Sequence, residues 1–337
     1  MLATSCIYNI LQEINTLSHT SKNEDVSKIC TALMSSYEDF MCENLRISVC
    51  GCYDVGKSSF INAILRQDIV VSSILPSTGV ITKIGWGETI QCEVYYESGE
   101  VKNISLEELE KFTVKDISNQ NRNLLGIREV SIRIPSSLLR KGVELIDTPG
   151  LDDSSEMDEI AYRQLDKSDF IIFILNALEL QNKSDLVMKY YNRLGKNVIF
   201  VVNKMDYCRT KRDYQDVTGL ANLYYKDYYN TITYTSDICF ISAQIDNAPL
   251  QHLIERLQET FFSEKDRIMR VSRLSIIEDE LSRLCDSLRL EQMSLEQVYK
   301  NTLDHKLKYH IEDLRSDMSS VRNIIKKIYK LNNDVIC

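Results

Sequence analysis

Several features that would assign this chain to other classes of protein are missing from its sequence. It has no run of about 18 apolar residues, the length that crosses a bilayer, and no basic-then-apolar signal pattern at its N-terminus. The terminal "DVIC" is not a prenylation box, because its cysteine stands last rather than fourth from the end. A net charge of -9 argues against general nucleic-acid binding. We therefore expect a cytoplasmic protein without a nucleic-acid partner, which could contact a membrane peripherally.

Paired metal-binding or redox cysteines are also lacking. The ten cysteines are irregularly spaced, and Cys50 and Cys52 do not form a CxxC pair. With 44% apolar residues, the chain can build a proper core. We expect reduced thiols inside that core.

Glycine and proline are absent from the C-terminal part, where Gly219 and Pro249 are the last of each. Two stripes with helical spacing follow: Val271, Leu274, Ile277, Leu281, Leu284, Leu288, and then Ile311, Leu314, Met318, Val321, Ile325, Ile328. Residues 1–44 read as two further helices. These helices could pack on a globular domain, but their narrow stripes favour a separate bundle. The expected organisation is N-terminal helices in residues 1–44, a globular domain in 45–260, and a C-terminal helical segment in 261–337.

Between these helical regions, short apolar runs alternate with longer mixed stretches. The runs are "RISVC", "VELID", "FIIFIL", "NVIFVV" and "ICFIS". Nearly continuous apolar strands are typical of a parallel sheet covered by helices. We therefore expect an α/β domain with a mostly parallel sheet, whose strands end at ligand-binding loops.

The stretch "GCYDVGKSSF" fits a phosphate-binding loop, since Gly51, Gly56, Lys57 and Ser58 match G-x-x-x-x-G-K-[ST]. Its backbone N–H groups would surround phosphate oxygens, with Lys57 reaching the β- and γ-phosphates and Ser58 ligating Mg²⁺. Alone, the motif is only suggestive.

Later loops identify the nucleotide. In "LIDTPG", Asp147 can hold magnesium through water and the Gly150 N–H can sense the γ-phosphate. In "NKMD", Asp206 can accept two hydrogen bonds that guanine offers and adenine lacks. "ISAQ" then supplies Ala243 for the guanine oxygen. The predicted ligand is GTP or GDP, bound by Gly51, Tyr53, Asp54, Val55, Gly56, Lys57, Ser58, Ser59, Asn203, Lys204, Asp206, Ser242 and Ala243.

The long stretch between Thr78 and Asp147 narrows the class of GTPase. It contains an expected hairpin in "CEVYYESGEV", a helix in "SLEELEKF" and a strand in "EVSIRIP". Together with "LPSTGVITKI", whose Thr78 is the candidate second magnesium ligand, this order resembles the dynamin superfamily over about residues 45–250. Bacterial dynamin-like proteins and mitofusin-type relatives are the nearest match.

The resemblance implies a P-loop GTPase domain with an extended insert, flanked by a helical neck bundle, and a homodimer through the GTPase domain. Family members continue into a stalk with a membrane-binding tip, and we expect no such hydrophobic tip here. The chain would then be a piece of a longer protein or a small member, which could work with a larger dynamin-like partner.

Hydrolysis requires a group that positions water, and Leu151 follows Gly150 where many small GTPases have glutamine. Asp54 occupies a phosphate-loop position that holds K⁺ or Na⁺ in dynamin-like and cation-activated GTPases. It could instead face solvent or bind a backbone turn. The candidate catalytic residues are Asp54, Lys57, Ser58, Thr78, Asp147 and Gly150.

We predict a GTPase that couples GTPase-domain dimerisation to movement of the helical neck, in membrane remodelling or in assembly with a larger partner. Two alternatives remain open at this point. One is a regulatory switch of the ribosome-assembly type. The other is a weakly hydrolysing, GTP-binding assembly subunit.

Overall fold

The structure is a computed structural model that describes residues 2–52, 54–71, 79–114, 124–151, 161, 164–165, 167–180, 197–229, 239–243 and 248–333. Two compact units divide the chain. One combines Met1–Glu43 with Asp266–Cys337, and the other is Asn44–Lys265. Each unit is described by itself.

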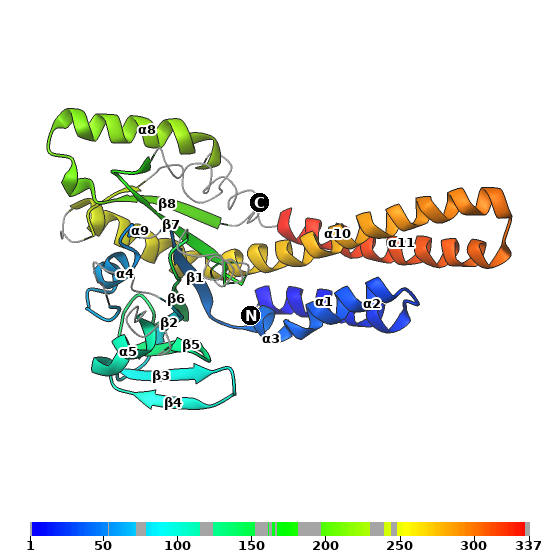
Figure 1. Ribbon diagram of the computed structural model, residues 1–337, viewed down its shortest axis with the longest axis horizontal. Coiled ribbons are helices and arrows are strands. Elements are labelled where there is room, and N and C mark those ends of the chain that lie inside the picture. Colours follow the sequence, from blue (N-terminus) through cyan, green and yellow to red (C-terminus); the bar gives the residue numbers. More distant parts are fainter. Residues whose placement is uncertain are drawn as a thin grey trace. The chain divides into compact units, whose positions relative to one another are not determined.

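A mixed sheet forms the centre of the 44–265 unit. Its described strands are β1 (Leu45–Cys50), β2 (Ile81–Trp86), β3 (Gln91–Tyr96), β4 (Val101–Ile104), β5 (Ile127–Ile134), β6 (Val143–Asp147), β7 (Phe170–Asn176), β8 (Asn197–Asn203) and β9 (Cys239–Phe240). Their order is β4-β3-β5-β2-β6-β1-β7-β8-β9 (Figure 1). The strands from β6 to β9 in this order pair in parallel. Every residue of β1 and β7 is buried, as their continuous apolar sequences predict.

The insert extends the sheet on one side. Strand β2 pairs antiparallel with β6 and parallel with β5, and β3 joins β5 and β4 in antiparallel pairs. Figure 1 shows β3, β4 and β5 at one end of the sheet, with β8 towards the other. The predicted α/β fold with a mostly parallel sheet and an extended insert is confirmed. The sequence did not single out β2, whose residues overlap the segment "LPSTGVITKI" that carries Thr78.

Short and long helices complete this unit. They are α4 (Lys57–Leu65), α5 (Leu109–Thr113), α8 (Lys211–Tyr229) and α9 (Ala248–Ser263), with 3₁₀ turns at Leu106–Glu108 and Met205–Tyr207. The Phe261 ring of α9 packs edge-on against Phe170 of β7, with ring centroids 5.3 Å apart. This contact packs α9 against strand β7 of the sheet.

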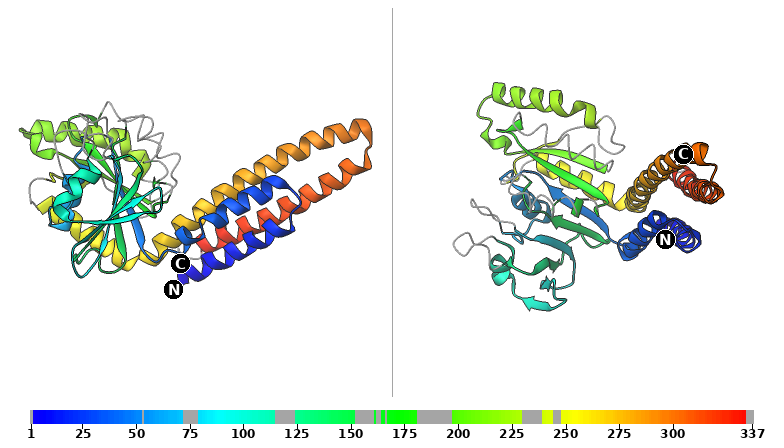
Figure 2. Two further views of the ribbon diagram at one scale, coloured as in Figure 1. Left: turned by 60° about the horizontal axis from the view of Figure 1, so that its bottom comes forward. Right: turned by 45° about the vertical axis from the view of Figure 1, so that its right-hand side comes forward.

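The other unit is a helical bundle. Its helices are α1 (Leu2–Thr20), α2 (Glu24–Ser35), α3 (Tyr37–Met41), α10 (Lys265–Thr302) and α11 (His305–Asn333). Figure 2 shows α1, α2, α10 and α11 side by side, and one hydrophobic core joins them. The predicted bundle is therefore confirmed. Ile324 rather than Ile325 is the fully buried member of the α11 stripe.

A buried arginine ties together one end of this bundle. Arg273 of α10 is 0% exposed and donates hydrogen bonds to the carbonyl oxygens of Phe40, at 2.8 Å, and Cys42, at 2.5 Å. These carbonyls lie at the C-terminal end of α3, where helix geometry leaves backbone acceptors without intrahelical partners. The Arg273 guanidinium therefore satisfies backbone acceptors at the C-terminal end of α3.

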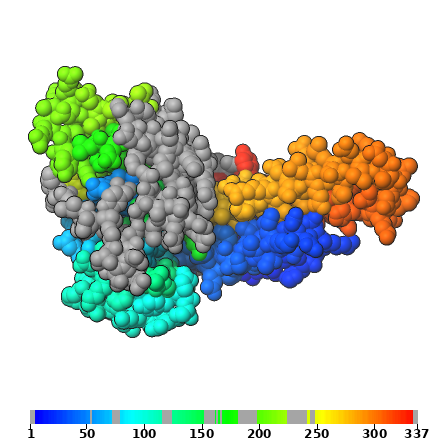
Figure 3. Space-filling model, viewed as in Figure 1, coloured from blue at the N-terminus to red at the C-terminus, as the bar shows by residue number. Residues whose placement is uncertain are grey.

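At its opposite end, the α10–α11 hairpin continues beyond α1 and α2 (Figure 3). We call residues 289–310 the hairpin end; all of them are described and none is buried. Polar contacts link its two helices, including Arg315–Glu296 at 2.7 Å and His310–Glu291 at 3.2 Å. Its exposed apolar side chains are Leu290, Met293, Val298, Leu303 and Tyr309. The buried residues of this hairpin end before its turn, with Leu288 on α10 and Ile311 on α11. The absence of the family's hydrophobic tip stays a prediction.

Candidate nucleotide site

The candidate site lies where the parallel strands end. Strand β1 leads into the phosphate loop, its neighbour β6 ends at Asp147, and β8 ends at Asn203. The hydroxyl of Thr148 donates to the carbonyl oxygen of Val49 at 3.0 Å, which holds the segment after β6 against β1. The topology brings the predicted loops to one edge of the sheet, as doubly wound folds require.

Two glycines in the phosphate loop occupy positions that no other residue fits. Gly51 has φ 154°, and a Cβ there would lie 2.4 Å from the carbonyl oxygen of Ile174. Gly56 has φ 87°, and its Cβ would lie 2.5 Å from Nδ2 of Asn203. The loop therefore depends on glycine for both its backbone conformation and its close packing.

The two side chains expected to face phosphate and magnesium are buried in this loop. Nζ of Lys57 donates to the carbonyl oxygens of Gly51, at 3.2 Å, and Cys52, at 3.0 Å. Oγ of Ser58 donates to Oδ2 of the fully buried Asp147 at 3.1 Å. A hydroxyl and a carboxylate are the hard oxygen ligands that Mg²⁺ prefers, so these residues fit that ion. The predicted second ligand Thr78, like Tyr53, lies outside the described residues.

Asn203 connects three loops. Its Nδ2 donates to the carbonyl oxygen of Val55 at 3.0 Å, and its Oδ1 accepts from the N–H of Ala243 at 2.9 Å. The side chain is almost fully buried, at 3% exposed. Both ends of its amide thus bind protein, which makes Asn203 a brace between the phosphate loop and the predicted base-binding loops.

The remaining base-loop residues are positioned from the backbone. The Asp206 N–H donates to Oγ of the buried Ser242 at 2.8 Å, while the Asp206 side chain is exposed. Backbone bonds from Met205 to Ile241 and from Ile241 to Val202 hold this segment beside β8. Asp206 is therefore fixed by its own N–H, and its carboxylate is accessible to a ligand.

Asp54 contacts the base loop directly. Its Oδ2 lies 3.2 Å from Nζ of Lys204, and the two side chains are 62% and 22% exposed. Both residues have left-handed backbones, with φ 56° and 64°. The sequence suggested a cation ligand or a solvent-facing group for Asp54, but not this ion pair.

Leu151 is fully buried and cannot orient water. Its N–H donates to the carbonyl oxygen of Gly51 at 3.1 Å, and the adjacent Cys52 forms a parallel bridge with it. The segment carrying Gly150 is thus joined to the first residues of the phosphate loop. The leucine at this position has a packing role.

Sequence reasoning missed Asn62, on the buried side of α4. Its Nδ2 donates to the carbonyl oxygen of Val70 at 2.8 Å, and its Oδ1 accepts from the N–H groups of Ile69, at 3.0 Å, and Val70, at 2.8 Å. It therefore orders residues 69 and 70, shortly before the segment "LPSTGVITKI" that carries Thr78. Its place in an otherwise apolar helix face, within "SSFINAIL", was the available signal.

Thiols near the site are structural. Cys50 and Cys52 are buried, and burial raises the pKa of the Cys50 thiol above its ordinary value. The cysteines at positions 6, 30, 42, 50, 52, 92, 208 and 285 are free thiols, in agreement with the expectation from their spacing. A neutral buried thiol is a poor nucleophile, so we assign these residues no chemistry.

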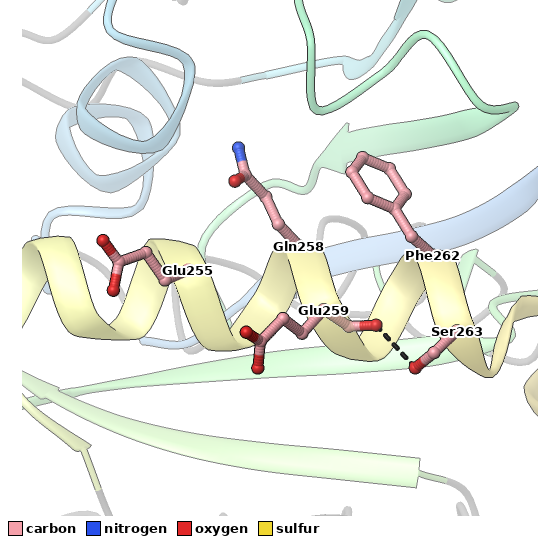
Figure 4. A pocket seen from close by; sticks show the side chains of 5 residues that line it. All are labelled: Glu255, Gln258, Glu259, Phe262 and Ser263. Carbon is pink, nitrogen blue, oxygen red and sulfur yellow. Dashed lines mark hydrogen bonds between the residues drawn. The ribbon is translucent and has the colours of Figure 1, made fainter.

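A shallow hollow along α9 gives no competing site. Glu255, Gln258, Glu259, Phe262 and Ser263 line it, and none of them is a nucleotide-loop residue (Figure 4). The hydroxyl of Ser263 donates a hydrogen bond to the carbonyl oxygen of Glu259 at 2.6 Å. Nζ of Lys141 lies 4.5 Å from the centroid of the Phe262 ring. Because all five lining residues come from one helix, the hollow has no converging set of chemical groups.

The fold and these loops define a P-loop GTPase domain. Residues 47–205 match the model described as "Dynamin family", and the domain is therefore a dynamin-family GTPase domain. No helix in the described part of the chain is both long and apolar enough to span a bilayer.

Two individual proteins are similar to this chain over different lengths. The chain is 23% identical over 338 residues to the uncharacterised protein of the xynA 3′ region of Caldicellulosiruptor sp. strain Rt8B.4, covering 96% of this chain and 81% of that protein. It is 25% identical over 251 residues to Dynamin-like protein 1 of Campylobacter jejuni, covering 62% of this chain but 34% of the relative.

A solved chain from an oligomerised bacterial dynamin pair has the same fold. The TM-score is 0.52 at 18% identity, covering 99% of this chain and 65% of the other. That pair is described as providing a mechanism for the long-range sensing and tethering of membranes.

Proposed function

We propose that the chain binds GTP and hydrolyses it to GDP, and that nucleotide-dependent pairing of two GTPase domains moves the helical bundle. The observation that carries this proposal is the meeting of the Lys57–Ser58 loop, Asp147 and the Asn203–Asp206 loop at one edge of the sheet. The dynamin-family match supports GTP as the nucleotide.

The side chains have separate roles in this proposal. Lys57 leaves its loop carbonyls to neutralise the β- and γ-phosphates. Asp206 and Ala243 recognise guanine, while Lys204 lays its aliphatic stem along the base. The Gly150 N–H senses the γ-phosphate, and the Thr78 carbonyl orients the attacking water. Discrimination against adenine follows because adenine offers neither of the two donors that the Asp206 carboxylate would accept from guanine.

Ser58 and Thr78 would hold Mg²⁺, with Asp147 supporting it through water. When bound, the ion would neutralise charge on the β- and γ-phosphate oxygens. The hydrogen bond from Ser58 to Asp147 keeps the hydroxyl aligned at the start of α4. Asp54 is the proposed ligand of K⁺ or Na⁺, in a site completed when two domains dimerise face to face. Such a cation would have to displace the Lys204 ammonium from this carboxylate.

The hairpin end is the proposed membrane contact. Val298, Leu303 and Tyr309 are exposed there, and the stretch from 298 to 310 contains three lysines and one aspartate. Exposed apolar groups next to basic ones suit the surface of an anionic bilayer. The oligomerised bacterial pair supports the alternative of a larger dynamin-like partner at the bundle.

A turnover assay tests the central proposal. Wild-type protein should release phosphate from GTP in the presence of Mg²⁺, and Lys57→Ala should not bind nucleotide. Size-exclusion chromatography with GDP and a transition-state analogue of phosphate should show a dimer. Normal GTP turnover by Lys57→Ala would overturn the site, and a monomer under all nucleotide conditions would overturn dimerisation.

Sedimentation with anionic liposomes tests the membrane contact. Leu303→Ser should reduce binding, whereas Tyr329→Ser, at an exposed α11 residue outside the hairpin end, should not. Equal binding by both variants would exclude the hairpin end. Full nucleotide turnover without any liposome binding would favour a protein partner.

A further inference from the structure

The ion pair between Asp54 and Lys204 joins two loops that must both contact a nucleotide. Asp54 belongs to the phosphate loop, and Lys204 follows β8 in the base loop; their Oδ2 and Nζ atoms are 3.2 Å apart. The pair therefore spans from the phosphate side of the candidate site to its base side. Loops tied in this way cannot separate without breaking the contact.

The backbone presents both side chains for this contact. Asp54 and Lys204 each adopt the left-handed region, which costs a non-glycine residue about 1 kcal/mol or more. Strained conformations of this kind concentrate at functional sites. Aspartate accepts the left-handed region more readily than most residues, which gives Asp54 a reason beyond its charge to occupy this loop position.

A second link runs beside the pair. The buried amide of Asn203, the residue before Lys204, donates to the carbonyl oxygen of Val55, the residue after Asp54. The two loops are thus joined by one neutral, buried bond and one charged, partly exposed pair. Solvent reaches only the second of these, so it is the link that can open while the domain stays folded.

We propose that Asp54 is a positioning residue for Lys204, and that their ion pair slows nucleotide release by holding the phosphate and base loops together. This inference rests on the proposed GTP-binding function. Lys204 also offsets the repulsion that an isolated carboxylate would exert on a triphosphate. The acid in the phosphate loop then has a role in the resting protein that needs no monovalent cation.

The expected effect is modest because Asp54 is 62% exposed. Exposed ion pairs contribute little and are screened by salt, so losing the pair should speed nucleotide release about two- to five-fold. Screening depends on ionic strength and not on cation identity. Choline chloride should therefore accelerate release as much as potassium chloride.

Release of a fluorescent GDP analogue, measured by stopped flow, tests this inference. Asp54→Asn keeps the side-chain shape and tolerates the left-handed backbone, while Lys204→Met keeps an apolar stem for the base. Each should speed release about two- to five-fold, and the double variant should be no faster than the faster single variant. Lys22→Met removes a comparable exposed pair with Asp313 in the bundle and should leave release unchanged.

The outcomes separate this inference from the proposed function. Wild-type protein that fails to bind the analogue would overturn GTP binding itself. If Asp54→Asn binds the analogue normally and releases it at the wild-type rate, the ion pair does not position the loops. The same conclusion follows if the release rates of the two single variants multiply in the double variant. If Asp54→Asn loses the stimulation of GTP hydrolysis by potassium but releases GDP at the wild-type rate, Asp54 serves only as a cation ligand.

Discussion

The side-chain amide of Asn203 donates to the carbonyl oxygen of Val55 at 3.0 Å, across the boundary between the base loop and the phosphate loop. The same side chain accepts from Ala243, so one buried asparagine satisfies a backbone group on each of two separate loops. The candidate nucleotide site is therefore a connected unit before any ligand contact is considered.

Replacing Asn203 with alanine should destabilise the GTPase domain and weaken nucleotide binding together. The substitution removes the partners of a buried carbonyl and a partly buried N–H, at a cost of about 1–3 kcal/mol in unfolding free energy. Urea unfolding followed by circular dichroism would measure this cost. Asn222→Ala, at an exposed position on α8, should change stability by less than about 0.5 kcal/mol. Equal effects of the two substitutions would contradict the bracing role.

Alanine at Gly56 should abolish nucleotide binding. Its Cβ would approach Nδ2 of Asn203 to 2.5 Å, and the left-handed φ of 87° would add backbone strain. Gly99 has nearly the same φ, 86°, but no atom within 4 Å of an added Cβ. Gly99→Ala is therefore a matched control for strain alone and should retain binding in a calorimetric titration with GDP. Binding by Gly56→Ala at wild-type affinity would show that Asn203 can move freely.

The role of Ser58 predicts how nucleotide affinity responds to magnesium. Ser58→Ala removes the hydroxyl that contacts Asp147 and that would ligate the ion. Wild-type affinity for GDP should fall about tenfold or more when EDTA replaces Mg²⁺, a loss of about 1.4 kcal/mol in binding free energy. The variant should show a much smaller dependence. A full magnesium effect in the variant would place the ion on other residues.

Part of this site was predictable because its signals are local. The motifs around Lys57, Asp147 and Asp206 are contiguous, and continuous apolar runs mark the strands that end at them. The contacts of Asn203 with Val55 and of Asp54 with Lys204 join residues that are far apart in the sequence. No short-range pattern encodes such pairings, and the motif at Asn203 indicates base recognition rather than bracing.

The fold shows the same division between local and distant information. The bundle followed from helical periodicity, since both stripes supply residues to one core. Strand β2 was missed because its first residues belong to the segment "LPSTGVITKI", which was interpreted through Thr78, and because its place in the sheet comes from pairing with β5 and β6. Ile324 is buried in the core while Ile325 is only partly buried against it, because a stripe alone does not fix how a helix is rotated against its neighbours.

Glu144 on β6 should make stability depend on pH. Burial raises its pKa above the ordinary value of 4.5, outweighing the opposite effects of Lys83 and Arg46; Glu129 and Asp169 raise it further. A raised folded-state pKa gives a stabilising contribution at acid pH that is lost as pH rises through that pKa. Glu144→Gln should therefore increase thermal stability near pH 7, with the gain shrinking below about pH 4.5. A gain that is constant across this range would contradict the assignment.

Arg273 provides a test confined to the helical bundle. Arg273→Met keeps much of the buried volume but removes the donors to the carbonyl oxygens of Phe40 and Cys42. Leaving buried acceptors without these bonds should lower the unfolding free energy of the bundle by about 1–3 kcal/mol. Hydrogen exchange of α3 and the first turns of α10 should become faster, since the contact between them is lost.

Arg283→Met, at an exposed α10 position paired with Glu280, is the matched control and should have little effect. Because Arg273 belongs to the bundle unit and the nucleotide loops to the 44–265 unit, the affinity for GDP should stay at the wild-type value. Unchanged hydrogen exchange in α3 would show that the guanidinium does not stabilise the end of that helix.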